Sequence, residues 1–366
     1  MMYSQLIFIC VILIKSVIEA SFLEKMKLQN QLLQTADESH PCLRDCIEGD
    51  SKICNFTFQV DMYTTMSVRC GDCPYNLTAC SNPSCITGGG ISRSVVNVNR
   101  RVPGPSINVC ENDTVVVDVI NNLKTDPLTI HWHGIHQINS PYMDGAPFVT
   151  QCPISPGNSF RYKFLAFPHG THMWHGHVGF QESDGLFGSF VIRRNEPAHI
   201  KSLYDFDLPE HTMTVWHWYN ETNEDILPKI LHKNGSVFGY GFLINDKAAF
   251  KTFYKNNEQF STPRAKFTVA KGNRYRFRVI SNGAIYCPFQ MSIDNHHMNV
   301  ISSDTTAFEP VLAESLILNA GERFSFILEA KQTEGCYWIR FRGTGDCGPK
   351  KSSVHSEAYL CYEGFD

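Results

Sequence analysis

Short runs of alternating apolar and polar residues restrict the fold of this chain more than any other feature. Examples are Ser94–Asn99, Thr114–Ile120 and Phe160–Leu165. Alternation with a period of two is typical of strands that bury one face. Turn residues such as Pro103-Gly104-Pro105 separate the runs, and no stretch in this region keeps an apolar helical period for more than about two turns. The pattern predicts an antiparallel β-sandwich.

A second strand-rich block starts near residue 211. Its expected strands are Lys266–Val269, Tyr275–Ile280, Gln290–Ile293, Phe324–Glu329 and Cys336–Arg340. The polar, proline-bearing stretch Arg193–Pro209 would connect the two blocks. A length of 366 residues also favours two domains over one. We therefore expect an all-β chain with sandwich domains at residues 91–195 and 196–366, preceded by a cysteine-rich segment at residues 21–90.

The first twenty residues resemble a secretory signal. Nine apolar residues, Leu6–Ile14, precede Lys15, and a small-residue cleavage site ends at Ala20. The alternative is a membrane anchor, but nine residues cannot cross roughly 30 Å of hydrocarbon. We expect cleavage, a secreted extracellular protein and no membrane contact afterwards. A formal charge of −4 with both signs interspersed argues against a nucleic-acid partner.

Export changes how the cysteines are interpreted. Fourteen cysteines less Cys10 of the signal leave thirteen, most of which should form disulfides in an oxidising compartment. The pair Cys70 and Cys73 could instead suggest zinc or redox chemistry, but no histidines or second CxxC lie at zinc-finger spacing. Five glycosylation sequons agree with export: Asn55, Asn76, Asn112, Asn220 and Asn234.

Two histidine pairs are the strongest chemical signal, His131-Trp132-His133 and His175-Gly176-His177. Residues i and i+2 of a strand point to the same face, so each pair would present two imidazoles side by side. A single pair of this kind is common as an ordinary surface or core feature. Two pairs, each flanked by tryptophan and glycine, favour a metal site, and a purely nitrogen donor set favours copper.

Several longer strings resemble insect laccase-type multicopper oxidases. They are NRRVPGPSINVC (99–110), HWHGIHQ (131–137), YMDGAPFVTQCPI (142–154), GTHMWHGHVGFQESDGLFGSFVIR (170–193), KGNRYRFRVI (271–280) and CYWIRFRG (336–343). The resemblance covers the chain from about residue 40 to its end and implies two cupredoxin-like Greek-key domains. It also implies that His131 binds a type 2 copper and that His133, His175 and His177 bind a type 3 pair, where dioxygen is reduced to water.

Other residues near the pairs have less certain roles. Asp144 lies where the family places a carboxylate near the type 2 copper, from which it could pass protons; alternatively it is a turn residue before Gly145. We expect His172 and His136 to make hydrogen bonds behind the ligands, His169 to be a loop residue and the adjacent pair His296-His297 to be structural.

The resemblance also defines what the sequence lacks. In the family, a third domain supplies four further histidines and the type 1 copper site in HPxHLHG-like and HCHxxxHxxxM-like runs, and neither run occurs here. We expect an incomplete cluster, no type 1 ligands and a truncated chain that is inactive alone. Relatives pair the cysteine equivalent to Cys152 with one in the third domain, so Cys152 should be the odd cysteine. Cys361 is the alternative, and an intermolecular bridge is another.

Three functions remain open. The first is a laccase-type oxidase that takes electrons from diphenols or similar small reductants and passes them to dioxygen. The second is a secreted copper-binding protein without catalysis, favoured for the chain alone by the missing HCH run. The third is an oxidase for ferrous iron or ascorbate. A missing third domain would also leave an apolar face uncovered, which predicts self-association.

Overall fold

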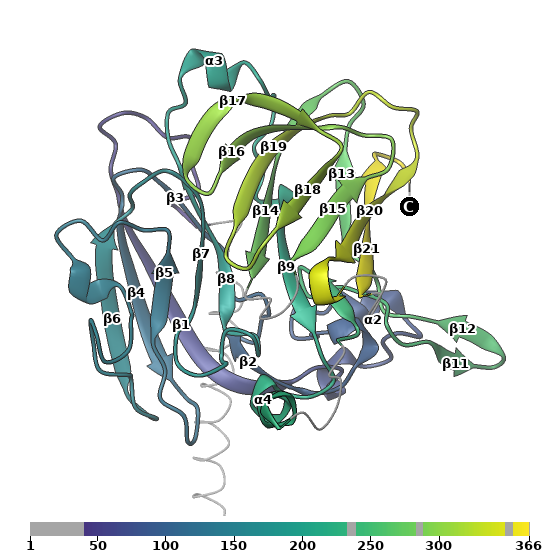
Figure 1. Ribbon diagram of the computed structural model, residues 1–366, viewed down its shortest axis with the longest axis horizontal. Helices are drawn as coiled ribbons and strands as arrows, with labels where there is room; N and C mark the ends of the chain where they lie inside the picture. The colour runs from purple at the N-terminus through teal and green to yellow at the C-terminus, as the bar shows by residue number, and fades with distance from the viewer. Residues whose placement is uncertain (1–39, 233–238, 283–287, 348–353, 366) are drawn as a thin grey trace, which may run out of the picture.

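Two β-sandwiches lie side by side in the computed structural model (Figure 1). It describes residues 40–232, 239–282, 288–347 and 354–365. The predicted all-β class is confirmed. The expected signal segment 1–20, Cys10 and the sequon at Asn234 lie outside the described residues.

The first sandwich consists of two four-stranded sheets. One has the order β2-β1-β4-β6 and the other β3-β8-β7-β5. The strands are β1 Ile53–Thr64, β2 Ser94–Val98, β3 Ile107–Cys110, β4 Thr114–Asn121, β5 Ile130–His133, β6 Ser159–Leu165, β7 Gly170–Gly176 and β8 Phe187–Arg193. Trp132 and Trp174, which are sequence neighbours of the paired histidines, are fully buried between the sheets with Phe58 and Phe190.

The expected antiparallel arrangement is only partly right. β1 runs parallel to β4, and β3 runs parallel to β8. Alternation of apolar residues sets which face of a strand is buried but not the direction of its neighbour. In addition, β1 falls within the segment 21–90 that we separated from the sandwich, so residues 53–64 of that segment form a central strand of the first sheet.

The second sandwich has sheets in the orders β10-β9-β14-β19-β16-β17 and β13-β21-β20-β15-β18, and a β11-β12 hairpin projects from it (Figure 1). Its strands are β9 Thr212–Trp218, β10 Gly241–Ile244, β11 Phe253–Lys255, β12 Glu258–Phe260, β13 Lys266–Val269, β14 Arg274–Asn282, β15 Phe289–Ile293, β16 Met298–Ser303, β17 Thr306–Ala313, β18 Ser315–Leu318, β19 Arg323–Glu329, β20 Cys336–Gly343 and β21 His355–Tyr362. In each sandwich the first strand runs parallel to a strand near the middle of the domain, β1 to β4 and β9 to β14. The last strand runs parallel to an early one, β8 to β3 and β21 to β13. The two domains therefore share one topology.

In the part of the chain that the structure describes, helices are few and short. The α-helices are α2 Leu77–Cys80, α3 Ala198–Lys201 and α4 Asn223–Leu231, and the 3-10 helices are η1 Val68–Cys70, η2 Gly88–Gly90, η3 Pro141–Met143, η4 Pro209–His211 and η5 Gly345–Cys347. Within the described residues, no helix has the length and apolar character needed to cross a bilayer.

Disulfides are numerous, as expected for an oxidising compartment, and Cys42–Cys54 and Cys46–Cys110 hold the N-terminal segment to the first sandwich. The described pairs are Cys42–Cys54, Cys46–Cys110, Cys70–Cys85, Cys73–Cys80 and Cys336–Cys361. Cys70 and Cys73 lie in two different disulfides, which rules out the zinc alternative. Cys361 is bonded, so it is not the odd cysteine. Cys152 is free and exposed.

The connection between the sandwiches is packed and not an exposed linker. Asp207 accepts a 2.6 Å hydrogen bond from Nη2 of Arg278, which is 1% exposed, and Arg276 donates to Glu196 at 2.8 Å. Burial alone would raise the pKa of Asp207, but the charges of Arg278, Arg193 and Arg276 outweigh it and hold that pKa far below its usual value. An apolar cluster that includes Val95, Phe187 and the second domain's Trp216, Trp218 and Leu243 joins the sandwiches nearby.

Candidate metal centre

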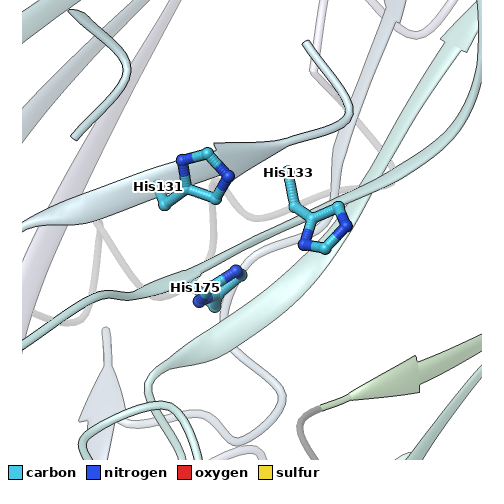
Figure 2. A group of neighbouring side chains, drawn as sticks. All are labelled: His131, His133 and His175. Atoms are coloured by element: carbon cyan, nitrogen blue, oxygen red, sulfur yellow. The ribbon is translucent and has the colours of Figure 1, made fainter. Parts of the chain in front are cut away.

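The two histidine pairs meet because β5 and β7 are antiparallel neighbours. Their register places His131 directly opposite His175. His133 points to the same face as His131, as the two-residue period requires. Figure 2 shows the rings of His131, His133 and His175 grouped around a common space. One ligand nitrogen from each of these three side chains lies within 4.8 Å of the others.

His177 completes the group from a position one residue past the end of β7. Its ring stacks on that of His175 with centroids 5.8 Å apart and lies 5.3 Å from that of His131. Its backbone N–H donates to the carbonyl of Thr129 at 3.2 Å, which fixes the chain as it leaves the strand. The four predicted ligands therefore lie together, and they come from two local i, i+2 motifs on adjacent strands.

Asp144 approaches His131 mainly through its backbone. Nδ1 of His131 donates to the Asp144 carbonyl at 2.8 Å, while the carboxylate Oδ2 lies 3.5 Å from the same nitrogen. Gly145 makes this approach possible: it has φ +81°, and a Cβ there would lie 1.8 Å from the Ile130 carbonyl oxygen. The two interpretations of Asp144 are compatible, because it follows the short helix η3 at a turn and also places a carboxylate beside a predicted ligand.

His175 has a carboxylate partner that the sequence analysis did not single out. Nδ1 of His175 lies 3.0 Å from Oε2 of Glu182 and also donates to the Gly176 carbonyl at 2.9 Å. Burial acts most strongly and would lower the pKa of His175, but the hydrogen bond and charge of Glu182, with the Gly176 carbonyl, together raise it. The string around Glu182 belongs to the resemblance, but nothing in the spacing indicated this contact.

The pKa values of His131 and His133 are lowered. Burial is the main cause that lowers the pKa of His131. For His133, burial and then the charge of Arg323 lower the pKa to about 3. Both imidazoles are therefore neutral near pH 7 and have a lone pair free for a metal.

The second domain closes over His133. Arg323, at the start of β19, donates from Nε to the Thr171 carbonyl at 2.9 Å and from Nη1 to the Gly321 carbonyl at 2.8 Å. Gly321 has φ +80°, and a Cβ there would lie 2.9 Å from Cε1 of His133. The sequence analysis missed both residues, because the contact joins positions more than 150 residues apart.

The remaining histidines lie outside the group. His172 is fully buried and its Nε2 donates to the Pro168 carbonyl at 2.8 Å, and the structure shows no bond from it to the four clustered histidines within the described residues. His136 packs against Phe167 with ring centroids 5.5 Å apart. Neither supports the expected role behind the ligands. His169 contacts Glu111 at 3.2 Å, and His296 bonds the Tyr362 hydroxyl at 3.0 Å and is structural, as predicted.

Four large apolar side chains that follow the first histidine pair in the sequence are exposed. They are Ile138, Tyr142, Phe148 and Val149, of which Phe148 and Val149 are 83% and 84% exposed. We call these four residues the apolar rim. Large apolar side chains this exposed at neighbouring positions are typical of surfaces that contact another protein.

Comparison with known proteins gives a consistent result. Family models described as multicopper oxidase match residues 80–197 and 205–364. Laccase-2 of Botryotinia fuckeliana is 33% identical over 282 residues, covering 76% of this chain and 47% of the relative. Laccase-5 of Trametes villosa is 37% identical over 265 residues, which cover 70% of this chain and 47% of that relative. The chain thus spans about half the length of these curated relatives.

Solved structures agree. The crystal structure of laccase from Botrytis aclada superposes with a TM-score of 0.72 at 29% identity, covering 87% of this chain and 54% of that one. A structure titled as multicopper oxidase mgLAC has a TM-score of 0.62 at 26% identity, covering 86% and 87%. These matches confirm the predicted cupredoxin-like domains.

Proposed function

The chain belongs to the multicopper oxidase family, and on that premise we propose that its four clustered histidines hold copper in a laccase-type oxidase. The reaction would reduce dioxygen to water with electrons from a diphenol or a similar small reductant. The observation that carries the proposal is the grouping of two half-buried, neutral imidazoles, those of His131 and His133, with those of His175 and His177 where β5 and β7 pair.

The donor set fits copper. The Nδ1–H groups of His131 and His175 are occupied by oxygen acceptors, which leaves Nε2 of each as the free lone pair. Imidazole nitrogens bind metals at roughly 2 Å, so nitrogens within 4.8 Å of one another can share one ion or two adjacent ions. Divalent copper is the first-row ion that such nitrogen ligands bind most tightly.

When bound, copper would accept electrons and deliver them to dioxygen. We assign His131 to the type 2 position and His133, His175 and His177 to the type 3 pair, following the family resemblance. The chain's own groups would then exclude water on the side of Arg323 and Gly321 and hold each imidazole in one orientation. We also propose Asp144 as the group that supplies protons, since its carboxylate lies 3.5 Å from Nδ1 of His131 and retains 29% exposure.

A secreted protein is consistent with these features, and we propose an extracellular location. Five described disulfides are typical of an oxidising compartment. The four sequon asparagines within the described residues, Asn55, Asn76, Asn112 and Asn220, are all exposed and accessible to glycosylation.

A second candidate function is copper binding without catalysis by this chain. It is favoured by one observation, the absence from the sequence of any cysteine flanked by histidines. A type 1 centre takes its electrons through a copper bound by one cysteine and two histidines. Without such a centre, electrons from a substrate would have no entry to the cluster.

One experiment separates the two candidates. Copper per chain would be measured by elemental analysis on dialysed protein, together with oxygen uptake in the presence of a diphenol. Copper with oxygen uptake supports the oxidase, and copper without uptake supports the second candidate. Absence of copper would contradict both.

A further inference from the structure

Glu182 is the one carboxylate whose side-chain oxygen lies at hydrogen-bond distance from a clustered histidine within the described residues. Its Oε2 lies 3.0 Å from Nδ1 of His175, and the two side chains are 22% and 8% exposed. By contrast, the carboxylate of Asp144 is 3.5 Å from its histidine. The contact of Glu182 is therefore both shorter and more shielded from water.

The turn that carries Glu182 is fixed on both sides. The backbone N–H of Asp184 donates to the Phe180 carbonyl at 2.9 Å, and that of Gly185 donates to the Glu182 carbonyl at 3.1 Å. Gln181 donates from its side chain to the Pro127 carbonyl at 2.9 Å. These bonds hold the carboxylate against His175 without relying on the ion pair itself.

The second domain anchors the same turn through Asp184. This buried carboxylate accepts a hydrogen bond of 2.7 Å from Arg93 and one of 2.9 Å from the side chain of Asn223. The Arg93 guanidinium in turn lies 4.0 Å over the ring of Trp218. Asn223 and Trp218 belong to the second domain, so the position of Glu182 depends on how the two domains pack.

Glu182 adds a negative charge behind His175, but it does not decide which ring nitrogen of His175 carries the hydrogen. Nδ1 of His175 also donates to the Gly176 carbonyl at 2.9 Å, and a carbonyl oxygen can only accept. Nδ1 therefore bears the hydrogen whether or not Glu182 is present. What Glu182 adds is a negative charge on the far side of the imidazole, which makes the ring a stronger electron donor at Nε2.

We propose that Glu182 is a positioning residue that makes the His175 site favour Cu(II) over Cu(I). The reason is electrostatic: the attraction between a fixed carboxylate and a metal ion is proportional to the charge of the ion, so the doubly charged form gains about twice as much free energy. His133 has the opposite environment, since the described charge that acts on it most strongly is the Arg323 cation. The cluster thus has an anionic side at His175 and a cationic side at His133. This inference rests on the proposed copper function.

The test uses Glu182→Gln, which keeps the shape of the side chain and removes its charge. Dissociation constants for Cu(II) in air and for Cu(I) under anaerobic conditions are measured by competition with chelators. Loss of a carboxylate behind a metal-binding histidine weakens metal binding by roughly 10- to 100-fold. We expect a loss of that size for Cu(II). Cu(I) carries half the charge and should lose half the free energy, which corresponds to the square root of the fold-change, or about 3- to 10-fold.

A matched control exists in the same domain. Glu111 contacts Nδ1 of His169 at 3.2 Å, which is the same kind of pair away from the cluster. Glu111→Gln should leave both constants unchanged. Glu182→Asp, which keeps the charge, should recover part of the preference for Cu(II).

The outcomes separate this inference from the function on which it rests. Equal losses for Cu(II) and Cu(I) in Glu182→Gln would indicate a purely structural role and overturn the inference, and so would unchanged constants. Failure of the wild-type protein to bind either ion would overturn the proposed function itself. Thermal unfolding of the metal-free variants verifies that each one is folded.

Discussion

Replacement of Gly321 by alanine tests whether the second domain shapes the metal centre. Gly321 has φ +80°, and the new Cβ would lie 2.9 Å from Cε1 of His133. Two costs follow. The left-handed backbone costs about 1–2 kcal/mol for a residue with a Cβ. Contact with a ring in a packed site costs a further ~1–3 kcal/mol unless the ring moves.

Gly272→Ala is a control that incurs only the backbone cost, so its comparison with Gly321→Ala isolates the cost of the contact with His133. Gly272 has φ +90° and nothing within 4 Å of the position of a Cβ. It should lose only the backbone contribution of about 1–2 kcal/mol. Both variants would be compared by chemical unfolding followed through tryptophan fluorescence, and their copper content would be measured after dialysis.

We expect Gly321→Ala to be less stable than Gly272→Ala and to lose copper, because His133 must shift by several tenths of an ångström. Gly272→Ala should keep the copper content of the wild type. If the two variants had the same stability and the same copper content, the second domain would not constrain His133 and this reasoning would be refuted.

Three other predictions concern separate parts of the molecule. Combined replacement of His131 and His133 by alanine should remove nearly all copper from dialysed protein while leaving a folded chain by circular dichroism, and unchanged copper would contradict the site. Asp207→Asn should lower the free energy of unfolding by about 3–5 kcal/mol at pH 7, because it leaves buried guanidinium groups uncompensated. The pKa of Asp207 is depressed in the folded state, so its contribution is complete above about pH 4 and is lost as the pH falls; an equal effect at pH 3 and pH 7 in urea titrations would count against it. Phe148→Ser with Val149→Ser should reduce self-association through the apolar rim, measured by analytical ultracentrifugation, and a wild-type protein that is already monomeric would contradict that role.

The histidine cluster could be predicted from sequence because its geometry is local. His131 and His133 are two residues apart on one strand, so their common face follows from backbone geometry alone. Strands such as Lys266–Val269 were predictable for the same reason, and β13 has those bounds. The identity of neighbouring strands is not local, so the parallel pairing of β1 with β4 had no signal in the alternation.

Residues that support the cluster were harder to predict. Arg323 bonds Thr171 across 152 positions, and no pattern in either segment indicates the other. Glu182 lies only seven positions after His175, but its carboxylate reaches the ring through an irregular turn that has no periodicity. β1 has the same alternation, at Phe56, Phe58, Val60 and Met62, but it lies in the segment that the sequence analysis set apart for its cysteines, so it was not predicted as a strand of the sandwich. Among the cysteines that the structure describes, Cys152 is free, as the resemblance implied, and its alternative Cys361 pairs with Cys336.

The most direct test of the central claim is anomalous X-ray scattering at the copper edge from crystals of the copper-loaded protein. We predict anomalous peaks over the histidine-bearing face of β5 and β7, with one at roughly 2 Å from Nε2 of His131 and one at roughly 2 Å from Nε2 of His175. Anomalous density elsewhere on the molecule, with none at the four histidines, would contradict the assignment of this site as the metal centre.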